Sequence, residues 1–244
     1  MPEQLAFTAL LNRIFAPVLD PLLRAIGFPP QYPQAPITNA VAMEILVVGL
    51  LLLVFVITRS RLSVERPGGL QHLFEGVHGF IQQQSHEIIG HHSESFTPFL
   101  VALGLFILSC NLLGVIPGFE SPTATPTVPL GCAICSFLYY NLQGIRRQGA
   151  LRYAKHFAGP MPALAPLMIP IEIISNLARM LSLTIRLFAN MFAGDMVTLV
   201  FFSLVPIGIP VIFLGLHIGV SLLQAYIFVL LSTVYLAGAV AEEH

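Results

Sequence analysis

The sequence predicts an all-α membrane protein with five membrane-crossing helices and one amphipathic surface helix, in which the last two crossings form a long, strongly tilted hairpin. Of its 244 residues, 56% are hydrophobic and only 9% are charged, whereas a soluble domain carries about 25% charged residues. The apolar residues come in runs long enough for a helix to cross about 30 Å of hydrocarbon. These runs are continuous, unlike the alternating ten-residue strands of a membrane barrel.

The composition also excludes several classes of protein. A formal net charge of −1 provides no basic surface for nucleic acid, and so apolar a chain is neither a soluble enzyme nor a disordered segment. The N-terminus lacks the basic region and the cleavage site of a signal peptide, and Pro17 and Pro21 interrupt its apolar run. We expect the three cysteines to be small apolar side chains, with a redox or metal pair at Cys132 and Cys135 as the alternative.

The chain divides into segments that follow these apolar runs. The first span is interrupted only by Glu44, and Thr97 with Pro98 provides an N-cap and a first-turn proline for the second. The residues PIGIP (206–210) predict a turn within the last apolar stretch. The expected segments are an outer N-terminal stretch (1–39), transmembrane helix 1 (40–58), an amphipathic cytoplasmic-side helix (68–92), transmembrane helices 2 (97–117) and 3 (128–145), and a hairpin that carries the ion path (160–240), all within one membrane domain.

The segment 68–92 is too polar to span a bilayer. Its apolar residues recur at the i, i+3, i+4, i+7 spacing of an amphipathic helix, so we expect it to lie on the cytoplasmic surface or against a partner. These residues are Leu70, Leu73, Phe74, Val77, Phe80 and Ile81. Three of its histidines, His86, His91 and His92, have no metal-ligand spacing. We therefore expect neither a metal site nor a cofactor.

The basic residues indicate the orientation of the chain. Seven of the eleven Lys and Arg residues follow the first and third spans, whereas the only charged residue of the loop 118–127 is the acid Glu120. The positive-inside rule then puts the N-terminus outside and the C-terminus in the cytoplasm. The residues concerned are Arg59, Arg61, Arg66, Arg146, Arg147, Arg152 and Lys155.

Two arginines, Arg179 and Arg186, lie inside the fourth span. An arginine at the bilayer centre costs about 2.5–3.5 kcal/mol on insertion scales and cannot lose its proton, so a counter-group has to face it. An internal salt bridge to Glu172 or Asp195 is the structural alternative. At about 100° per residue Asp195 lies opposite Arg186, and Glu172 is about 21 Å away along the axis, so neither can pair with Arg186 on a straight helix.

Polar residues form a stripe on each of the last two spans. A row of polar residues with one permanent charge favours an ion path over isolated residues that a neighbour satisfies. The stripe on the fourth span, spaced 3, 4, 4 and 3, consists of Arg179, Ser182, Arg186, Asn190 and Ala193. The stripe on the fifth span consists of His217, Ser221, Gln224, Phe228 and Tyr235.

The turn near Pro206 determines the relative depth of these groups. Asp195 lies eleven residues before it and His217 eleven after, so an antiparallel hairpin brings this acid and histidine to one level near the outside. Arg186 and Gln224 share a deeper level by the same count. Each arm of about 35 residues is about 52 Å long, well beyond the hydrocarbon thickness, so we expect a strong tilt.

The residues SLTIRLFANMFAGD (182–195), followed by His217 and by LQAYIF (223–228), resemble subunit a of bacterial F-type ATP synthases. The resemblance implies that Arg186 is the essential ion-gating arginine facing the carboxylates of the rotating c-ring, with Arg179 and Ser182 on the same ring-facing stripe. The outer half-channel would contain Asn190, Asp195, His217 and Gln224. The cytoplasmic half-channel would contain Glu172 and Ser175.

The same resemblance implies a proton-translocating subunit of the Fo sector in the bacterial inner membrane. Its expected partners are the c-ring, subunit b of the peripheral stalk, the lipid bilayer and, indirectly, the F1 ATPase. No Gly-x-x-x-x-Gly-Lys-Ser/Thr motif is present, so we expect no catalysis in this chain. The alternatives are a free-standing secondary ion transporter, for which the two halves show no repeat, and an intramembrane hydrolase using Asp195 and His217, for which no nucleophile motif is present.

Overall fold

The computed structural model describes residues 5–25, 27, 30, 32, 34–63, 68–90, 93–116, 118–149, 165–204 and 208–241. These residues contain helices and no strand, which confirms the predicted all-α class. The α-helices are α1 (Ala6–Ala25), α2 (Asn39–Ser60), α3 (Gly69–Ile89), α4 (Thr97–Leu113), α5 (Thr127–Gln148), α7 (Ala165–Leu204) and α8 (Ile209–Val240), and the short 3₁₀ turns are η1 (Ser93–Ser95) and η2 (Pro122–Ala124).

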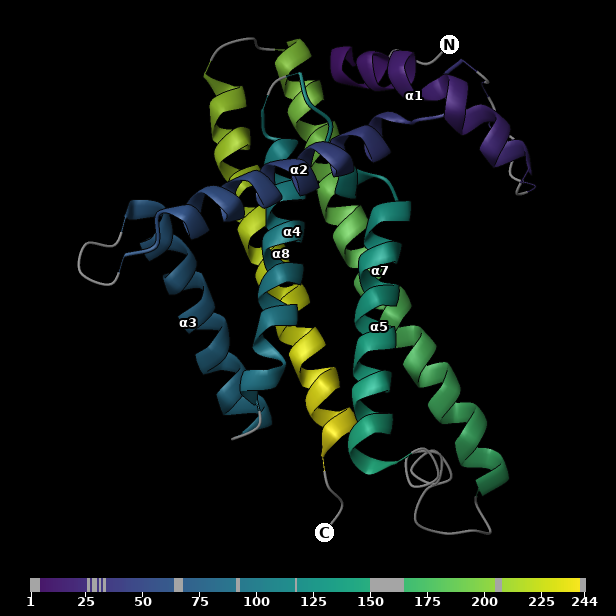
Figure 1. The fold of residues 1–244 in the computed structure, drawn as a ribbon, viewed down its shortest axis with the longest axis vertical. Helices are drawn as coiled ribbons and strands as arrows, with labels where there is room; N and C mark the ends of the chain where they lie inside the picture. Colours follow the sequence, from purple (N-terminus) through teal and green to yellow (C-terminus); the bar gives the residue numbers. More distant parts are fainter. Residues whose placement is uncertain are drawn as a thin grey trace.

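Four helices form the body of the molecule. α4, α5, α7 and α8 run along its long axis and pack against one another, whereas α2 crosses them and packs on α4 and η2 (Figure 1). α3 packs on α4 and α8, and α1 packs on α2. The start of α1 and the end of α8 lie at opposite ends of the long axis (Figure 1).

The core of the four-helix body is built from apolar side chains one helical turn apart. On α7 these are Leu183, Leu187 and Met191, which are 3% exposed or less. In lipid, such contacts stabilise helix pairs through close packing and hydrogen bonds rather than by excluding water. A hydrogen bond of 2.9 Å between the hydroxyls of Ser136 and Ser232 links α5 to α8. The cluster is completed by Leu103, Ile107, Cys132, Ala133, Ala225 and Phe228.

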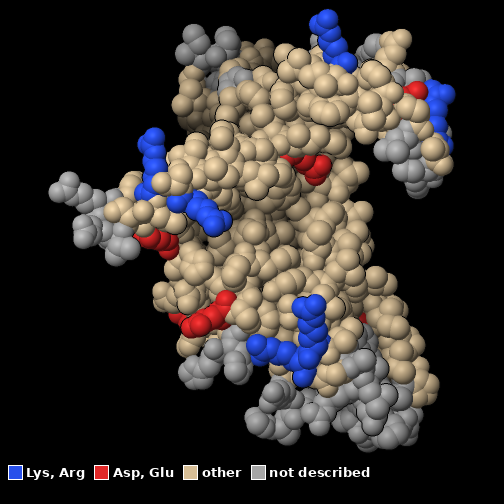
Figure 2. Space-filling model, in the orientation of Figure 1, with Lys and Arg blue, Asp and Glu red and all other residues tan. Residues whose placement is uncertain are grey.

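Four helices of the described chain are long and apolar enough to cross a membrane: α1, α2, Pro166–Leu204 within α7 and Val211–Val240 within α8. α4 is apolar but has only 17 residues, and α5 carries Arg146 and Arg147 in its last turn. The count of five crossings therefore stays a prediction. Figure 2 shows a broad surface with few charged side chains, as expected for a protein in lipid.

Several elements differ from the sequence expectations. The N-terminal stretch contains a helix, α1, which continues through Pro17 and Pro21. Asn12 on this helix exchanges two 3.0 Å hydrogen bonds with the backbone of Ile37. α3 ends at Ile89, where Gly90 adopts a φ of +89° that favours glycine. The residues Arg66, His91, His92, Arg152, Lys155 and Pro206 and the ranges 160–164 and 242–244 lie outside the described residues.

Candidate functional site

Arg186 lies midway along α7, on the side where Ser182 and Asn190 are exposed. Its Nη2 atom donates a hydrogen bond of 3.4 Å to the Ser182 hydroxyl. No acidic residue in the described part of the chain forms an ion pair with this arginine. The guanidinium is thus a permanent charge in a spanning helix without a counter-charge from the residues around it.

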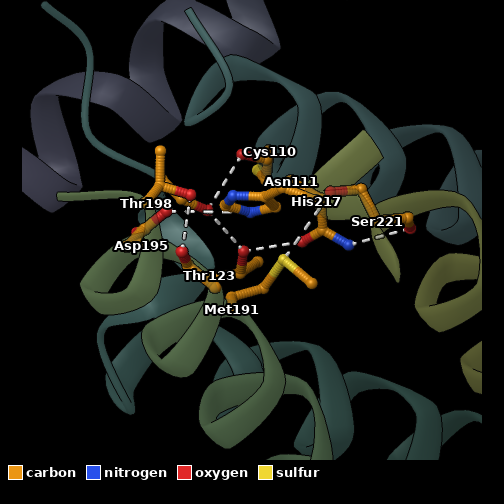
Figure 3. A network of polar contacts seen from close by, with 10 residues as sticks. Cys110, Asn111, Thr123, Met191, Asp195, Thr198, His217 and Ser221 are labelled. Atoms are coloured by element: carbon orange, nitrogen blue, oxygen red, sulfur yellow. Dashed lines mark hydrogen bonds and ion pairs between the residues drawn. The ribbon is translucent and has the colours of Figure 1, made fainter. Parts of the chain in front are cut away.

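In the C-terminal half of α7, toward the connection with α8, the two helices bring an acid and a histidine together. Oδ1 of Asp195 lies 3.7 Å from Nε2 of His217, and Figure 3 shows the two side chains pointing toward one another. His217 is 4% exposed, and its Nε2 makes no hydrogen bond to the described chain. Its imidazole packs on Gly194, where an added Cβ would lie 3.3–3.4 Å from three ring atoms. The absence of a side chain at Gly194 therefore lets the two helices approach.

Beside this pair lies an open cavity of about 560 Å³. Asp195 and His217 form part of its wall together with Glu120 and Thr125 of the loop between α4 and α5. Glu120 also accepts a hydrogen bond of 3.1 Å from the Asn39 amide at the start of α2. A cavity of this size with carboxylates in its wall can hold water molecules that lead from the loop to the buried histidine.

Between this cavity and Arg186, the two helices are joined by a pair of amides. Nδ2 of Asn190 donates a hydrogen bond of 2.8 Å to Oε1 of Gln224. Asn190 is one helical turn beyond Arg186, and Gln224 is 2% exposed. The two amides thus join α7 to α8 between the Asp195–His217 pair and Arg186.

In the N-terminal half of α7, the second arginine has partners of its own. Nη2 of Arg179 lies 3.9 Å from Oε1 of Glu172, and its guanidinium lies 5.5 Å above the centre of the Tyr235 ring. The Glu172 carbonyl accepts a 3.2 Å hydrogen bond from Asn176, which in turn accepts one of 3.1 Å from the Tyr140 hydroxyl. α5 and α8 therefore both contact this end of α7, through Asn176 and Arg179, and Arg179 alone of these residues contacts the Glu172 carboxylate.

The predicted site residues thus fall into two groups along α7. Asn190 pairs with Gln224, and Asp195 pairs with His217, between the C-terminal half of α7 and α8. Glu172 and Arg179 come together at the other end, with the half-buried Ser175 three residues beyond Glu172. Ser182 contacts Arg186, whereas Arg179 contacts Glu172 and Tyr235.

A further polar network was missed in the sequence analysis. The Thr123 hydroxyl donates a 2.6 Å hydrogen bond to Asn111, whose amide donates one of 3.3 Å to the carbonyl of Ser221 on α8 (Figure 3). Asn111 and Thr123 are fully buried. The available signal was an amide within the apolar run of α4, because such a group needs a partner in lipid. The network links η2 to α4 and α4 to α8, next to the Asp195 cavity.

These features define a helical membrane protein in which two long helices carry polar side chains on either side of Arg186, which has no acidic partner in the described chain. Comparison with known proteins identifies the family. The family described as ATP synthase A chain matches residues 41–237. The ATP synthase subunit a of Koribacter versatilis (strain Ellin345) is 55% identical over 244 residues, which cover 100% of both chains.

Other relatives agree with this assignment. The ATP synthase subunit a of Solibacter usitatus (strain Ellin6076) is 55% identical over 90% of this chain and 93% of its own. A protein of Pelobacter propionicus named ATP synthase subunit a 3 is 41% identical over 84% of this chain and 89% of its own. The chain belongs to the ATP synthase subunit a family, as the arginine and glutamine motifs predicted, and is a proton-translocating subunit of the Fo sector. The alternative of a free-standing transporter is not supported.

Proposed function

We propose that Arg186 is the fixed cation that separates two half-channels and faces the ion-binding carboxylates of the c-ring. Asn190, Asp195, His217 and Gln224 form the half-channel that opens to the outside. Glu172 and Ser175 form the half-channel that opens to the cytoplasm, and Ser182 lies on the surface that faces the ring. Arg179 does not form part of that surface in this proposal, because its contacts are with Glu172 and Tyr235, and it acts on the Glu172 carboxylate.

One observation carries this proposal: Arg186 has no acidic partner in the described chain although it lies in a spanning helix. A charge at such a position costs about 2.5–3.5 kcal/mol on insertion scales unless it is compensated. A carboxylate on a neighbouring subunit compensates it. The surface next to Arg186 suits a moving neighbour, because Ala189 and Ala193 are small and exposed and allow close approach.

The arrangement supports proton transfer in separate steps. A protonated ring carboxylate is neutral and can travel through lipid, whereas beside a guanidinium the ionised form is favoured and the proton leaves. Arg186 also repels a proton that would pass straight from Asp195 to Glu172, so the proton has to travel on the ring. Each charge that crosses 100 mV supplies about 2.3 kcal/mol to this rotation.

The crossing of α2 over the bundle supports a strong tilt of the last two helices. α2 is the most apolar of the candidate spans and runs across α7 and α8 rather than along them (Figure 1). If α2 stands upright in the bilayer, α7 and α8 lie toward the membrane plane. Their lengths of 40 and 32 residues, about 60 and 48 Å at 1.5 Å per residue, exceed the hydrocarbon thickness and agree with this arrangement.

The assembly and orientation follow from the same function. The chain is a multi-pass protein of the bacterial inner membrane, with its N-terminus outside and its C-terminus in the cytoplasm. It contacts the c-ring and subunit b of the peripheral stalk, and it acts on the F1 ATPase through rotation. Catalysis takes place elsewhere in the complex, and this chain provides only the ion path.

The test is proton-driven ATP synthesis in membranes that carry the complex with Arg186→Ala. We expect ATP synthesis to be abolished, with the complex assembled and proton leakage increased. Leu181→Ala, an exposed neighbour on α7, is the matched control and should retain synthesis. Normal synthesis in Arg186→Ala would remove the central role of this residue.

A further inference from the structure

Glu120 lies in the loop between α4 and α5, and the path proposed along α7 and α8 gives it no role. Its side chain lines the same open cavity of about 560 Å³ as Asp195 of α7 and His217 of α8. These three are the titratable groups in the described wall of the cavity, and α2 contributes the neutral Asn39 beside Glu120. Glu120 is exposed, whereas His217 is 4% exposed. Glu120 therefore lies toward the open end of the cavity.

The Glu120 carboxylate is held by Asn39, the first residue of α2. Nδ2 of Asn39 donates a hydrogen bond of 3.1 Å to Oε1 of Glu120. Oδ1 of the same amide accepts a hydrogen bond of 3.3 Å from the backbone N–H of Leu5, immediately before α1. One amide thus connects the start of α1 to the loop that carries Glu120. Because both of its ends are bonded, its N–H groups are directed at the carboxylate.

α1 also anchors the chain just before Asn39. Asn12 of α1 donates a hydrogen bond to the carbonyl of Ile37 and accepts one from its N–H, both of 3.0 Å. Asn12 and Ile37 are 3% and 6% exposed, and Ile37 packs into the apolar cluster between α1 and α2. These contacts fix residues 37–39 against α1. They precede residues 41–237, which match the family, so the family match gives them no role.

We infer that Asn39 is a positioning residue for proton entry, which holds the Glu120 carboxylate at the open end of the Asp195–His217 cavity with α1 behind it. The inference rests on the proposed role of Asp195 and His217 in the outer half-channel. A charge at the mouth of a cleft with low-dielectric walls raises the local concentration of opposite ions and the rate at which they enter. Glu120 thus collects protons from the surrounding water. The hydrogen bond from Asn39 keeps this charge at the cavity.

ATP synthesis in inverted membrane vesicles with the intact complex tests the role of Glu120. The outer side of the protein faces the lumen of such vesicles, so the pH of the lumen sets the supply of protons. Glu120→Gln removes the charge but keeps an oxygen for Asn39. We expect synthesis about threefold below wild type at alkaline lumen pH and near wild type at acidic pH, because capture limits flux only when protons are scarce. High salt in the lumen should reduce the difference, since it screens an exposed charge.

Asp20→Asn is the matched control for the loss of an acid. Asp20 pairs with Arg24 on α1 at 3.0 Å and lies outside the described wall of the cavity. We expect this variant to match wild type at every lumen pH, with equal amounts of assembled complex. A loss equal to that of Glu120→Gln would show that the position of the charge at the cavity does not matter, and would overturn the inference.

Asn39→Ala tests whether the amide acts through Glu120. We expect a partial loss of synthesis with the same pH dependence, and no further loss when Asn39→Ala is added to Glu120→Gln, since the two changes then remove one effect. A loss that persists undiminished in the Glu120→Gln background, or that is the same at every lumen pH, would mean that Asn39 acts through packing and would overturn its assigned role.

Arg186→Ala in the same vesicles distinguishes this inference from the proposed function. If Arg186→Ala abolishes synthesis while Glu120→Gln equals wild type at alkaline lumen pH, the inference on proton entry fails and the proposed path stands. Retained synthesis in Arg186→Ala would contradict the proposed path itself, on which the inference rests.

Discussion

Gly194→Ala tests whether close packing of α7 on His217 positions Asp195 and His217, which we propose to transfer protons. The added Cβ would lie 3.3 Å from Cε1 and 3.4 Å from both nitrogens of the imidazole, so the ring has to move by a few tenths of an ångström. His217 is 4% exposed but lines the open cavity, so the ring can shift toward that cavity. Because Asp195 follows Gly194 on α7, a shift away from α7 also lengthens the 3.7 Å separation of Asp195 and His217.

The expected loss of proton flux in Gly194→Ala follows from this geometry. Proton transfer needs a heavy-atom distance of about 2.6–3.2 Å or one bridging water, so the pair has to come closer than it is at rest. Inserting a methylene into a packed core costs about 1–3 kcal/mol, and the small displacement here puts Gly194→Ala at the lower end. If about 1 kcal/mol enters the barrier, proton flux falls about fivefold, since about 1.4 kcal/mol corresponds to a factor of ten.

Passive proton flux into membrane vesicles stripped of F1 measures this effect. Gly219→Ala on α8 is the matched control, because a Cβ there meets nothing within 4 Å. We expect flux to fall several-fold in Gly194→Ala and to stay near wild type in Gly219→Ala, with equal amounts of assembled complex. Wild-type flux in Gly194→Ala, or an equal loss in the control, would refute the reasoning.

Two further predictions concern the contact between Arg179 and Glu172 and the buried hydrogen bonds of Asn111 and Thr123. Arg179→Gln removes the cation beside Glu172 and should slow ATP-driven proton pumping several-fold, as measured by quenching of a pH-sensitive dye. Arg179→Lys keeps the charge and should restore part of the pumping rate. Equal pumping rates in the two variants would argue against a charge effect. Thr123→Val leaves the buried Asn111 oxygen without its donor and should lower stability by about 1–3 kcal/mol. Thermal denaturation of the purified complex measures this loss, and Thr123→Ser, which keeps the hydroxyl, should retain stability.

Much of the hairpin could be predicted from the sequence because helix geometry is regular. Counting residues from Pro206 put Asp195 and His217 at one level, and their side chains lie 3.7 Å apart. The same regularity excluded a bond from Arg186 to either acid on its own helix, and neither acid forms one. Such counts succeed where one helix, or two helices joined by a short turn, determine the geometry.

Contacts that depend on how helices are rotated, or on elements distant in the sequence, could not be predicted in the same way. Arg179 occupies the same stripe as Arg186, but its partner Tyr235 comes from α8 and depends on how the two helices are rotated. The pairing of Asn111 with Thr123 depends on the path of the loop that carries η2. The crossing of α2 over the bundle follows from tertiary packing, since apolar periodicity indicates which segment is a helix but not its direction.

The central claim is tested most directly by the distance from the Arg186 guanidinium to the nearest carboxylate of a neighbouring subunit, in a structure of the assembled membrane sector. The account predicts a ring carboxylate that reaches within about 4–6 Å, the range in which an opposite charge favours the ionised form. A guanidinium that faces only lipid, with every neighbouring carboxylate far beyond that range, would contradict it.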